Sequence, residues 1–232
     1  MALPFFYTGN YKKEQQVMLD EDTSRHVVQV LRMKAGEQLN LTDGKGHLLL
    51  CEVLEANKKH CTVNVVGSWL TPHVSRHITI AISLLKNANR FEWFLEKATE
   101  IGVSEIIPLI CERTEKEKFR YDRMNAICIS AMLQSQQCWL PVLHQPMDFS
   151  KAVTLSTANQ KYIAHCDDGA KNQLTSQSFN QSAIILIGPE GDFTPKEIEL
   201  ALANQFIPVS LGETRLRTET AGVVAAALLC LV

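Results

Sequence analysis

The segment 184–229, close to the C-terminus, contains two similar units, each an apolar run followed by a loop and then by a helix-forming stretch. The apolar runs are Ile184–Ile187 and Ile207–Leu211, and a glycine follows each of them directly. Such strand–loop–helix units are typical of α/β domains, in which ligands gather at the carboxyl ends of parallel strands. The two loops are therefore candidates for a binding site.

The first loop, Gly188-Pro-Glu-Gly191, leads into a strong helix start. Thr194 and Glu197 have the spacing of a capping box, and Pro195 stands at the first helical position, where its missing N–H costs nothing. The glycines of the loop allow the backbone to approach a ligand closely. This combination predicts a rigid turn in front of a well-defined helix.

The second loop, Gly212–Thr218, precedes a helix that carries no charge after Glu219. A helix that is apolar on all sides is buried, and this one is too short to span a bilayer. We expect this helix to support the loop from below. Because one domain offers limited room to bury every face, we also expect a homodimer that covers part of it.

Neither loop is a common phosphate-binding motif. Gly188–Thr194 lacks the lysine of a P-loop, and the dinucleotide fingerprint Gly-x-Gly-x-x-Gly is absent. On residue types alone, two interpretations stay open: ordinary strand-to-helix turns, or ligand-binding loops of a rarer kind.

The two loops, read as GPEGDFTPKE and LGETRLRTETA, resemble the signature loops of the ribosomal RNA small subunit methyltransferase E family. Enzymes of that family use S-adenosylmethionine to methylate N3 of a uridine in 16S rRNA, and they belong to the knotted SPOUT methyltransferases. The stretch LLKNANRFEWFLEKATEIGV is also similar to the family, although Lys86-Asn-Ala-Asn89 replaces its usual turn. Another departure is Asp192, where many members have a second glycine.

The N-terminal part, residues 1–70, is predicted to be a small β-rich unit. We expect a helix over Asp22–Met33, with Val27, Val30 and Leu31 facing inward, followed by strands at Gln38–Thr42, His47–Leu54 and His60–Val66. The resemblance implies that this unit is a PUA-like RNA-binding barrel, since His-x-x-x-Val-Leu-Arg at 26–32 matches the opening helix of such units. Trp69–Val74 is the expected linker.

From residue 75 to residue 232 the pattern alternates between strands and helices. The expected elements are strands at Ile78–Leu85, Glu105–Ile110 and Lys161–Cys166, helices at Asn89–Ile101 and Tyr121–Trp139, a loop over 167–182, and the two C-terminal units. This alternation predicts an α/β domain with a mostly parallel sheet and helices on both faces. The resemblance adds a SPOUT methyltransferase domain with a trefoil knot, formed as the last helix threads the preceding loop.

Methyl transfer requires a cofactor pocket and a group that stabilises the uracil anion. The motif loops and the adjacent strand ends supply the expected cofactor-binding residues: His165, Ile187, Gly188, Pro189, Glu190, Gly191, Leu211, Gly212, Leu216, Arg217, Thr218, Glu219, Thr220 and Ala221. Arg217 is the catalytic candidate, because its planar fork can face a uracil oxygen. A structural role, with Arg217 paired to Glu219 or Glu190, is the alternative. Glu190, Glu219 and His165 are all candidates for the base.

Four basic residues are candidates for RNA contacts: Arg25, Arg32, Lys86 and Arg113. Arg25 and Arg32 are seven positions apart and would share one helical face. The alternative is that both are solvated surface residues without an RNA contact. The chain's formal net charge of −2 is unusual for a protein that binds RNA, but the segment Arg113–Arg123 is locally basic. The alternative functions are a non-catalytic RNA-binding or ribosome-assembly protein and a SPOUT methyltransferase that acts on tRNA.

The seven cysteines are odd in number and scattered, which favours reduced thiols and a cytoplasmic location. The adjacent pairs His60-Cys61 and His165-Cys166 do not have the spacing of metal ligands, so no metal is expected. The sequence shows no secretory signal pattern and no long apolar run, so we expect no membrane association.

Overall fold

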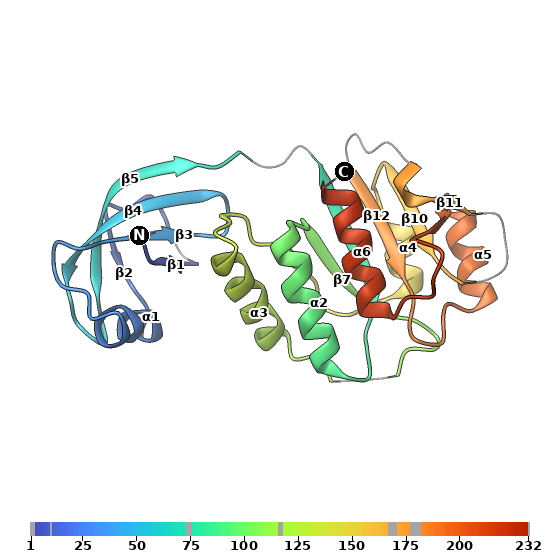
Figure 1. Ribbon diagram of the computed structural model, residues 1–232, viewed down its shortest axis with the longest axis horizontal. Helices are drawn as coiled ribbons and strands as arrows, with labels where there is room; N and C mark the ends of the chain where they lie inside the picture. The colour runs from blue at the N-terminus through green and yellow to red at the C-terminus, as the bar shows by residue number, and fades with distance from the viewer. Residues whose placement is uncertain are drawn as a thin grey trace. The chain divides into compact units, whose positions relative to one another are not determined.

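A computed structural model describes residues 3–9, 11–72, 76–115, 118–166, 171–176 and 182–231. The chain forms two compact units, one made of Met1–His73 with Met132–Leu140, the other of Val74–Ala131 with Pro141–Val232 (Figure 1). Part of the linker expected at Trp69–Val74 lies outside the described residues. Trp69 itself belongs to a strand that runs from Thr62 to Leu70.

The N-terminal unit is a curled five-stranded sheet with the order β1-β3-β4-β5-β2 (Figure 1). Its strands are β1 (Phe5–Tyr7), β2 (Gln16–Met18), β3 (Gln38–Thr42), β4 (His47–Glu55) and β5 (Thr62–Leu70). The pair β1–β3 is parallel and the other pairs are antiparallel. Alternate side chains, among them Leu39, Leu41 and Leu49, are fully buried and form its core.

The turn between β3 and β4 is held by Asp43, which is buried. One carboxylate oxygen accepts the backbone N–H groups of Lys45 and His47 at 2.8 and 3.2 Å, and the other lies 2.8 Å from His47 Nδ1. Gly44 and Gly46 have φ angles of +70° and +94°, which glycine adopts without strain. This turn therefore joins β3 and β4 as an antiparallel hairpin.

The helix expected over Asp22–Met33 is shorter and partly of another type. It consists of α1 (Glu21–Arg25) and a π-helical turn, η1 (His26–Val30). The wider π turn rotates the following residues, so Val27 is buried as expected but Val30 is 65% exposed and Leu31 41% exposed. The prediction of Val30 and Leu31 as inward residues was wrong for this reason.

The helix expected over Tyr121–Trp139 ends earlier, as α3 (Tyr121–Gln134). The residues after it pair with the β3–β4 turn instead: Gly46 N–H donates to Cys138 O at 2.8 Å, and Leu140 N–H donates to Gly44 O at 2.9 Å. Long-range backbone hydrogen bonds thus replace the helical ones, and residues 132–140 belong to the N-terminal unit.

The C-terminal unit contains a sheet of eight strands in which every described pair is parallel, in the order β11-β13-β10-β12-β6-β7-β8, with β9 also on β7. Its strands are β6 (His77–Ser83), β7 (Glu105–Ile110), β8 (Val142–Leu143), β9 (Met147–Asp148), β10 (Gln160–Ala164), β11 (Asn172–Gln173), β12 (Ser182–Ile187) and β13 (Ile207–Ser210). The predicted parallel sheet is confirmed, and β7 has the predicted bounds.

Helices cover both faces of this sheet (Figure 1). They are α2 (Ala88–Ile101), α3, α4 (Phe149–Leu155), α5 (Pro195–Ala203) and α6 (Thr218–Leu231). Helices α4 and α5 pack in one apolar cluster with Ala81, Ile163 and Leu186 of the strands. Helix α6 contacts α2, β6 and β12. Helix α2 ends at Ile101, as the sequence predicted, and is capped by Gly102, which has φ +96°.

Helix α6 approaches its neighbours most closely at Gly222. A Cβ atom at this position would lie 2.7 Å from Cε2 of Phe94 and 2.8 Å from Cδ1 of Ile82. Only glycine allows this approach, so α6 is seated directly on α2 and β6. Its other side is less covered, because Leu231 is 70% exposed.

At the amino ends of the strands, the carboxylate of Glu105 accepts three hydrogen bonds. Thr79 Oγ1 lies at 2.7 Å and His77 Nε2 at 3.2 Å from one oxygen, and His144 Nε2 lies at 2.5 Å from the other. Burial raises the pKa of Glu105, but these hydrogen bonds outweigh it and the net pKa is lowered.

The segment expected as a loop, residues 167–182, contains regular structure. β11 and a 3₁₀ turn, η2 (Leu174–Ser176), lie within it, and β12 starts at Ser182. Residues 167–170 and 177–181 lie outside the described part of the chain. Within the described ranges, no helix combines the length and apolar content needed to cross a membrane.

Candidate functional site

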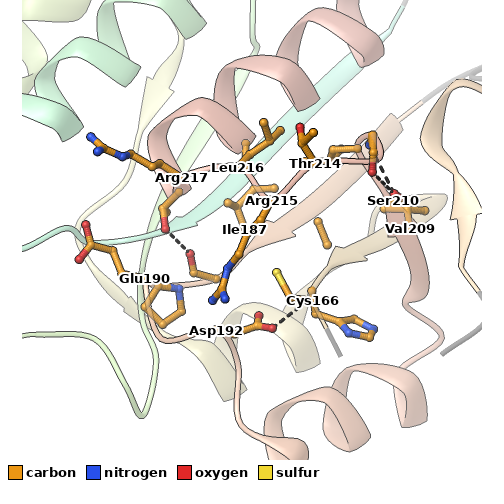
Figure 2. A pocket seen from close by; sticks show the side chains of 18 of the residues that line it. Cys166, Ile187, Glu190, Asp192, Val209, Ser210, Thr214, Arg215, Leu216 and Arg217 are labelled. Carbon is orange, nitrogen blue, oxygen red and sulfur yellow. Dashed lines mark hydrogen bonds between the residues drawn. The ribbon is translucent and has the colours of Figure 1, made fainter. Parts of the chain in front are cut away.

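A cavity of about 840 Å³ lies at the carboxyl ends of β10, β12 and β13 (Figure 2). Both motif loops line it. Among the expected cofactor-binding residues, the cavity wall includes His165, Ile187, Gly188, Pro189, Glu190, Leu211, Gly212, Leu216, Arg217, Thr218 and Ala221. Gly191, Glu219 and Thr220 are not part of the wall. The structure thus brings most of the expected set together around one space.

The first loop is held rigidly by the start of α5. Thr194 and Glu197 form the complete capping box, with Thr194 N–H donating to Glu197 Oε2 at 2.8 Å. Behind them, the ring of Phe193 packs on the ring of Phe149 with centroids 5.1 Å apart. Gly188 lies against Phe193, because a Cβ atom there would be 3.1 Å from its ring. The loop therefore rests on a packed aromatic support.

A hydrogen bond joins the two motif loops. The hydroxyl of Thr218, the first residue of α6, donates to the carbonyl oxygen of Gly188 at 2.9 Å (Figure 2). Thr218 is buried, so this bond is shielded from water. Because α6 is seated on α2 and β6 at Gly222, the bond fixes the first loop to the same support.

A second link between the loops is electrostatic. Arg90 Nη1 of α2 lies 2.7 Å from Glu190 Oε1, and Arg90 Nε lies 3.7 Å from Glu219 Oε1. The acids of both motifs are therefore paired with Arg90, which itself lines the cavity. The alternative interpretation, in which Arg217 pairs with Glu190 or Glu219, does not hold in this structure.

The two arginines of the second loop point in different directions. Figure 2 shows the side chain of Arg215 extending across the cavity, whereas that of Arg217 points away from its interior. Both residues line the wall and are exposed. In the described part of the chain, Arg217 makes no ion pair with an acid. Its guanidinium group is therefore open to a partner arriving from solvent.

The rim beyond β10 is formed by His165 and Cys166. Cys166 N–H donates to Asp192 Oδ2 at 2.7 Å, which links this rim to the first loop (Figure 2). The thiol of Cys166 is exposed, whereas the thiol of Cys111 is buried. Burial raises the pKa of Cys111 to about 12. Neither Asp192 nor Cys166 was in the expected set.

The four candidate RNA contacts are distributed over both units. In the N-terminal unit, Arg25 is paired with Glu21 at 3.0 Å, and Arg32 has φ +57° beyond the end of the helix. They do not share a helical face, so that argument was wrong, because the helix ends before Arg32.

The other two candidates belong to the C-terminal unit. Lys86 follows β6 and pairs with Glu115 at 2.8 Å, outside the cavity wall. Arg113 Nη1 donates to the carbonyl oxygen of Gly191 at 2.6 Å, so it supports the first loop from outside.

Sequence reasoning missed several residues of the cavity wall: Arg90, Ala164, Cys166, Lys171, Asp192, Val209, Ser210, Glu213, Thr214 and Arg215. Ala164, Val209 and Ser210 end their strands, so the rule that ligands gather at strand ends could have found them. Arg90 and Asp192 carried no such signal, because their roles depend on tertiary contacts. Among the described His, Cys, Asp and Glu side chains, no group of three or more is arranged to hold a metal ion.

Comparison with known proteins identifies both units. A family model described as an RNA methyltransferase domain matches residues 72–230, and one described as an RNA methyltransferase PUA domain matches residues 19–66. The ribosomal RNA small subunit methyltransferase E of Mycobacterium bovis is 30% identical over 238 residues, covering 97% of this chain and 90% of that protein.

Solved structures agree with this result. A probable rRNA methyltransferase from Porphyromonas gingivalis is 40% identical with a TM-score of 0.90, covering 97% of this chain and 95% of that one. A ribosomal RNA small subunit methyltransferase E from Neisseria gonorrhoeae, bound to S-adenosylmethionine, is 29% identical with a TM-score of 0.86, covering 97% and 96%.

Proposed function

The chain belongs to the ribosomal RNA small subunit methyltransferase E family, and on this premise we propose that it transfers a methyl group from S-adenosylmethionine to N3 of a uridine in 16S rRNA. The observation that carries the proposal is the joining of the two motif loops around one cavity, through Thr218 and Gly188. A protein that only binds RNA has no need of such a cavity.

The cavity fits the cofactor in size and in chemistry. Its volume of about 840 Å³ lies within the range of small-molecule sites. Ile187, Leu211 and Leu216 offer apolar surface for an adenine ring, and the glycines of the loops leave backbone groups accessible. At Gly212, a Cβ atom would meet nothing within 4 Å, so the backbone there faces open space. When bound, S-adenosylmethionine supplies an activated methyl group on a sulfonium.

N3 of uracil carries a proton at neutral pH. This proton must leave for N3 to accept the methyl group, so the enzyme must stabilise the resulting uracil anion. We assign this role to Arg217, whose exposed guanidinium can present two N–H groups to a uracil oxygen. Arg90 keeps Glu190 and Glu219 paired, so neither acid neutralises Arg217. We assign Arg215, which extends across the cavity, to cofactor binding.

The N-terminal unit, which matches a PUA domain, is proposed to read the RNA, and the C-terminal unit to perform the transfer. Arg25, Arg32, Lys86 and Arg113 remain the candidates for phosphate contacts. We further propose a homodimer through the less covered side of α6, where Leu231 is 70% exposed. A ribosomal substrate would place the enzyme in the cytoplasm.

The experiment that tests the cofactor site is a calorimetric titration of the full chain with S-adenosylmethionine. The informative variant is Gly212→Val, because residue 212 is exposed and has φ +150°, so a valine strains the loop without disturbing the core. We expect this variant to fold and to lose cofactor binding. A folded Gly212→Val protein with unchanged affinity would refute the placement of the site.

A further inference from the structure

Asp192 occupies a backbone conformation that glycine adopts more easily. Its φ angle is +63°, in the left-handed region, and its N–H donates to Pro189 O at 2.9 Å to close the turn. A residue with a side chain carries a strain cost there that glycine avoids. The side chain of Asp192 is therefore expected to contribute something that offsets this cost.

The carboxylate of Asp192 ties together two strand ends. Oδ2 accepts the N–H of Cys166 at 2.7 Å, and Oδ1 accepts the N–H of Phe193 at 2.8 Å. Cys166 follows β10 and Asp192 follows β12, and these strands are adjacent and parallel in the sheet. Cys166 and Asp192 both line the cavity, so the carboxylate closes the wall between the two strand ends (Figure 2).

The charge of Asp192 is not neutralised by an ion pair with any described residue, whereas the nearby acid Glu190 is paired with Arg90 at 2.7 Å. Asp192 is half-buried, and its two backbone hydrogen bonds leave its negative charge in place. The wall of the cavity thus carries an anion at this point.

The two forms of the cofactor differ in charge. S-adenosylmethionine carries a sulfonium, an ammonium and a carboxylate, with a net charge of about +1 at neutral pH, whereas the demethylated product S-adenosylhomocysteine is neutral overall. An anion in the wall attracts the first more than the second. Discrimination between them determines how strongly the product inhibits the enzyme.

We infer that Asp192 is a specificity-determining residue of the cofactor site, which closes the wall between β10 and β12 and favours the cationic methyl donor over the neutral product. This inference rests on the proposed function. It concerns the ratio of two affinities, and the proposed function requires only that the donor bind.

The test measures the dissociation constants of S-adenosylmethionine and S-adenosylhomocysteine by calorimetry on the full chain. Asp192→Asn removes the charge and keeps one oxygen acceptor, and Asp192→Gly removes charge and acceptor while relaxing the backbone. Glu199→Gln is the matched control, since Glu199 is exposed on α5 and does not line the cavity. Circular dichroism checks the fold of each variant.

We expect both Asp192 variants to lower the donor-to-product affinity ratio by on the order of fivefold, as expected for one partly screened charge. Asp192→Gly should also weaken both ligands, because the link to Cys166 is lost. Glu199→Gln should leave the ratio unchanged. Glycine takes the required backbone conformation freely, so the Gly variant folds even if the Asn variant does not.

An unchanged ratio in a folded Asp192 variant would overturn the inference while leaving the proposed function intact. A parallel loss in the Glu199→Gln control would also overturn it, because the effect would then reflect net charge. If the wild-type chain binds neither compound, the proposed function itself fails.

Discussion

The substitution Gly222→Ala should destabilise the C-terminal unit, although alanine is the better helix former. An added methyl group at Gly222 would lie 2.7 Å from the ring of Phe94 and 2.8 Å from Ile82 Cδ1, closer than real Cβ contacts. Phe94 and Ile82 are both fully buried, so neither can turn into solvent to make room. The methyl group can be accommodated only if α6 moves away from α2 and β6.

The magnitude follows from two opposing effects. Alanine in place of glycine inside a helix gains about 1 kcal/mol. Inserting a methyl group into a packed interior costs roughly 1–3 kcal/mol, and the upper half applies because both neighbours are immobile. We therefore expect the free energy of unfolding to fall by about 1–2 kcal/mol, with a drop of several degrees in Tm for a unit of this size.

The assay is denaturant unfolding of the full chain, followed by circular dichroism. A double-mutant cycle with Phe94→Leu isolates the clash, because the smaller side chain opens space for the methyl group. The double variant should be more stable than the two single effects predict by about 0.5 kcal/mol or more. A Gly222→Ala protein that is about 1 kcal/mol more stable than wild type, as at an open helical site, would refute the reasoning.

Three further predictions concern the site and the sheet. Arg217→Ala should keep the fold and the cofactor affinity within a few fold but slow single-turnover methyl transfer by on the order of a hundredfold, and Arg217→Lys should recover little; a wild-type rate would exclude Arg217 from catalysis. Glu105→Gln should lower the free energy of unfolding at neutral pH. The difference from wild type should shrink below pH 4.5, because a carboxyl with a lowered pKa loses its stabilising contribution only as it is protonated. A constant difference in urea unfolding down to pH 3 would contradict this. Cys166, the one exposed thiol of the seven, should react quickly with a thiol reagent and be protected by S-adenosylmethionine, with Cys166→Ser as the control; equal labelling with and without the cofactor would place the cofactor elsewhere.

Local signals in the sequence predicted several elements with accurate bounds. The capping box at Thr194 fixed the start of α5, and Gly102 fixed the end of α2. β7 followed from one apolar run, Glu105–Ile110. In each case the determining hydrogen bonds or dihedral angles lie within a few residues, so the sequence pattern contains the information. The grouping of the two motif loops followed from the strand-end rule and the resemblance.

Features that depend on distant contacts were missed or misplaced. α3 ends at Gln134 because Cys138 and Leu140 pair with a turn more than ninety residues earlier in the chain. The π turn after Arg25 rotated Val30 outward, which no helical periodicity predicts. The roles of Arg90 and Asp192 arise only once α2, β10 and β12 are adjacent. The trefoil knot, which was implied by the resemblance alone, stays a prediction.

We propose that the chain methylates N3 of a uridine in 16S rRNA through the cavity between the two motif loops. The most direct test incubates the full chain with S-adenosylmethionine carrying a labelled methyl group, together with small ribosomal subunits and tRNA from a strain that lacks the protein. Digestion to nucleosides should then yield labelled 3-methyluridine from 16S rRNA and none from tRNA. The Gly212→Val variant should give no label in either. Label in tRNA alone, label on another base, or undiminished transfer by Gly212→Val would contradict the account.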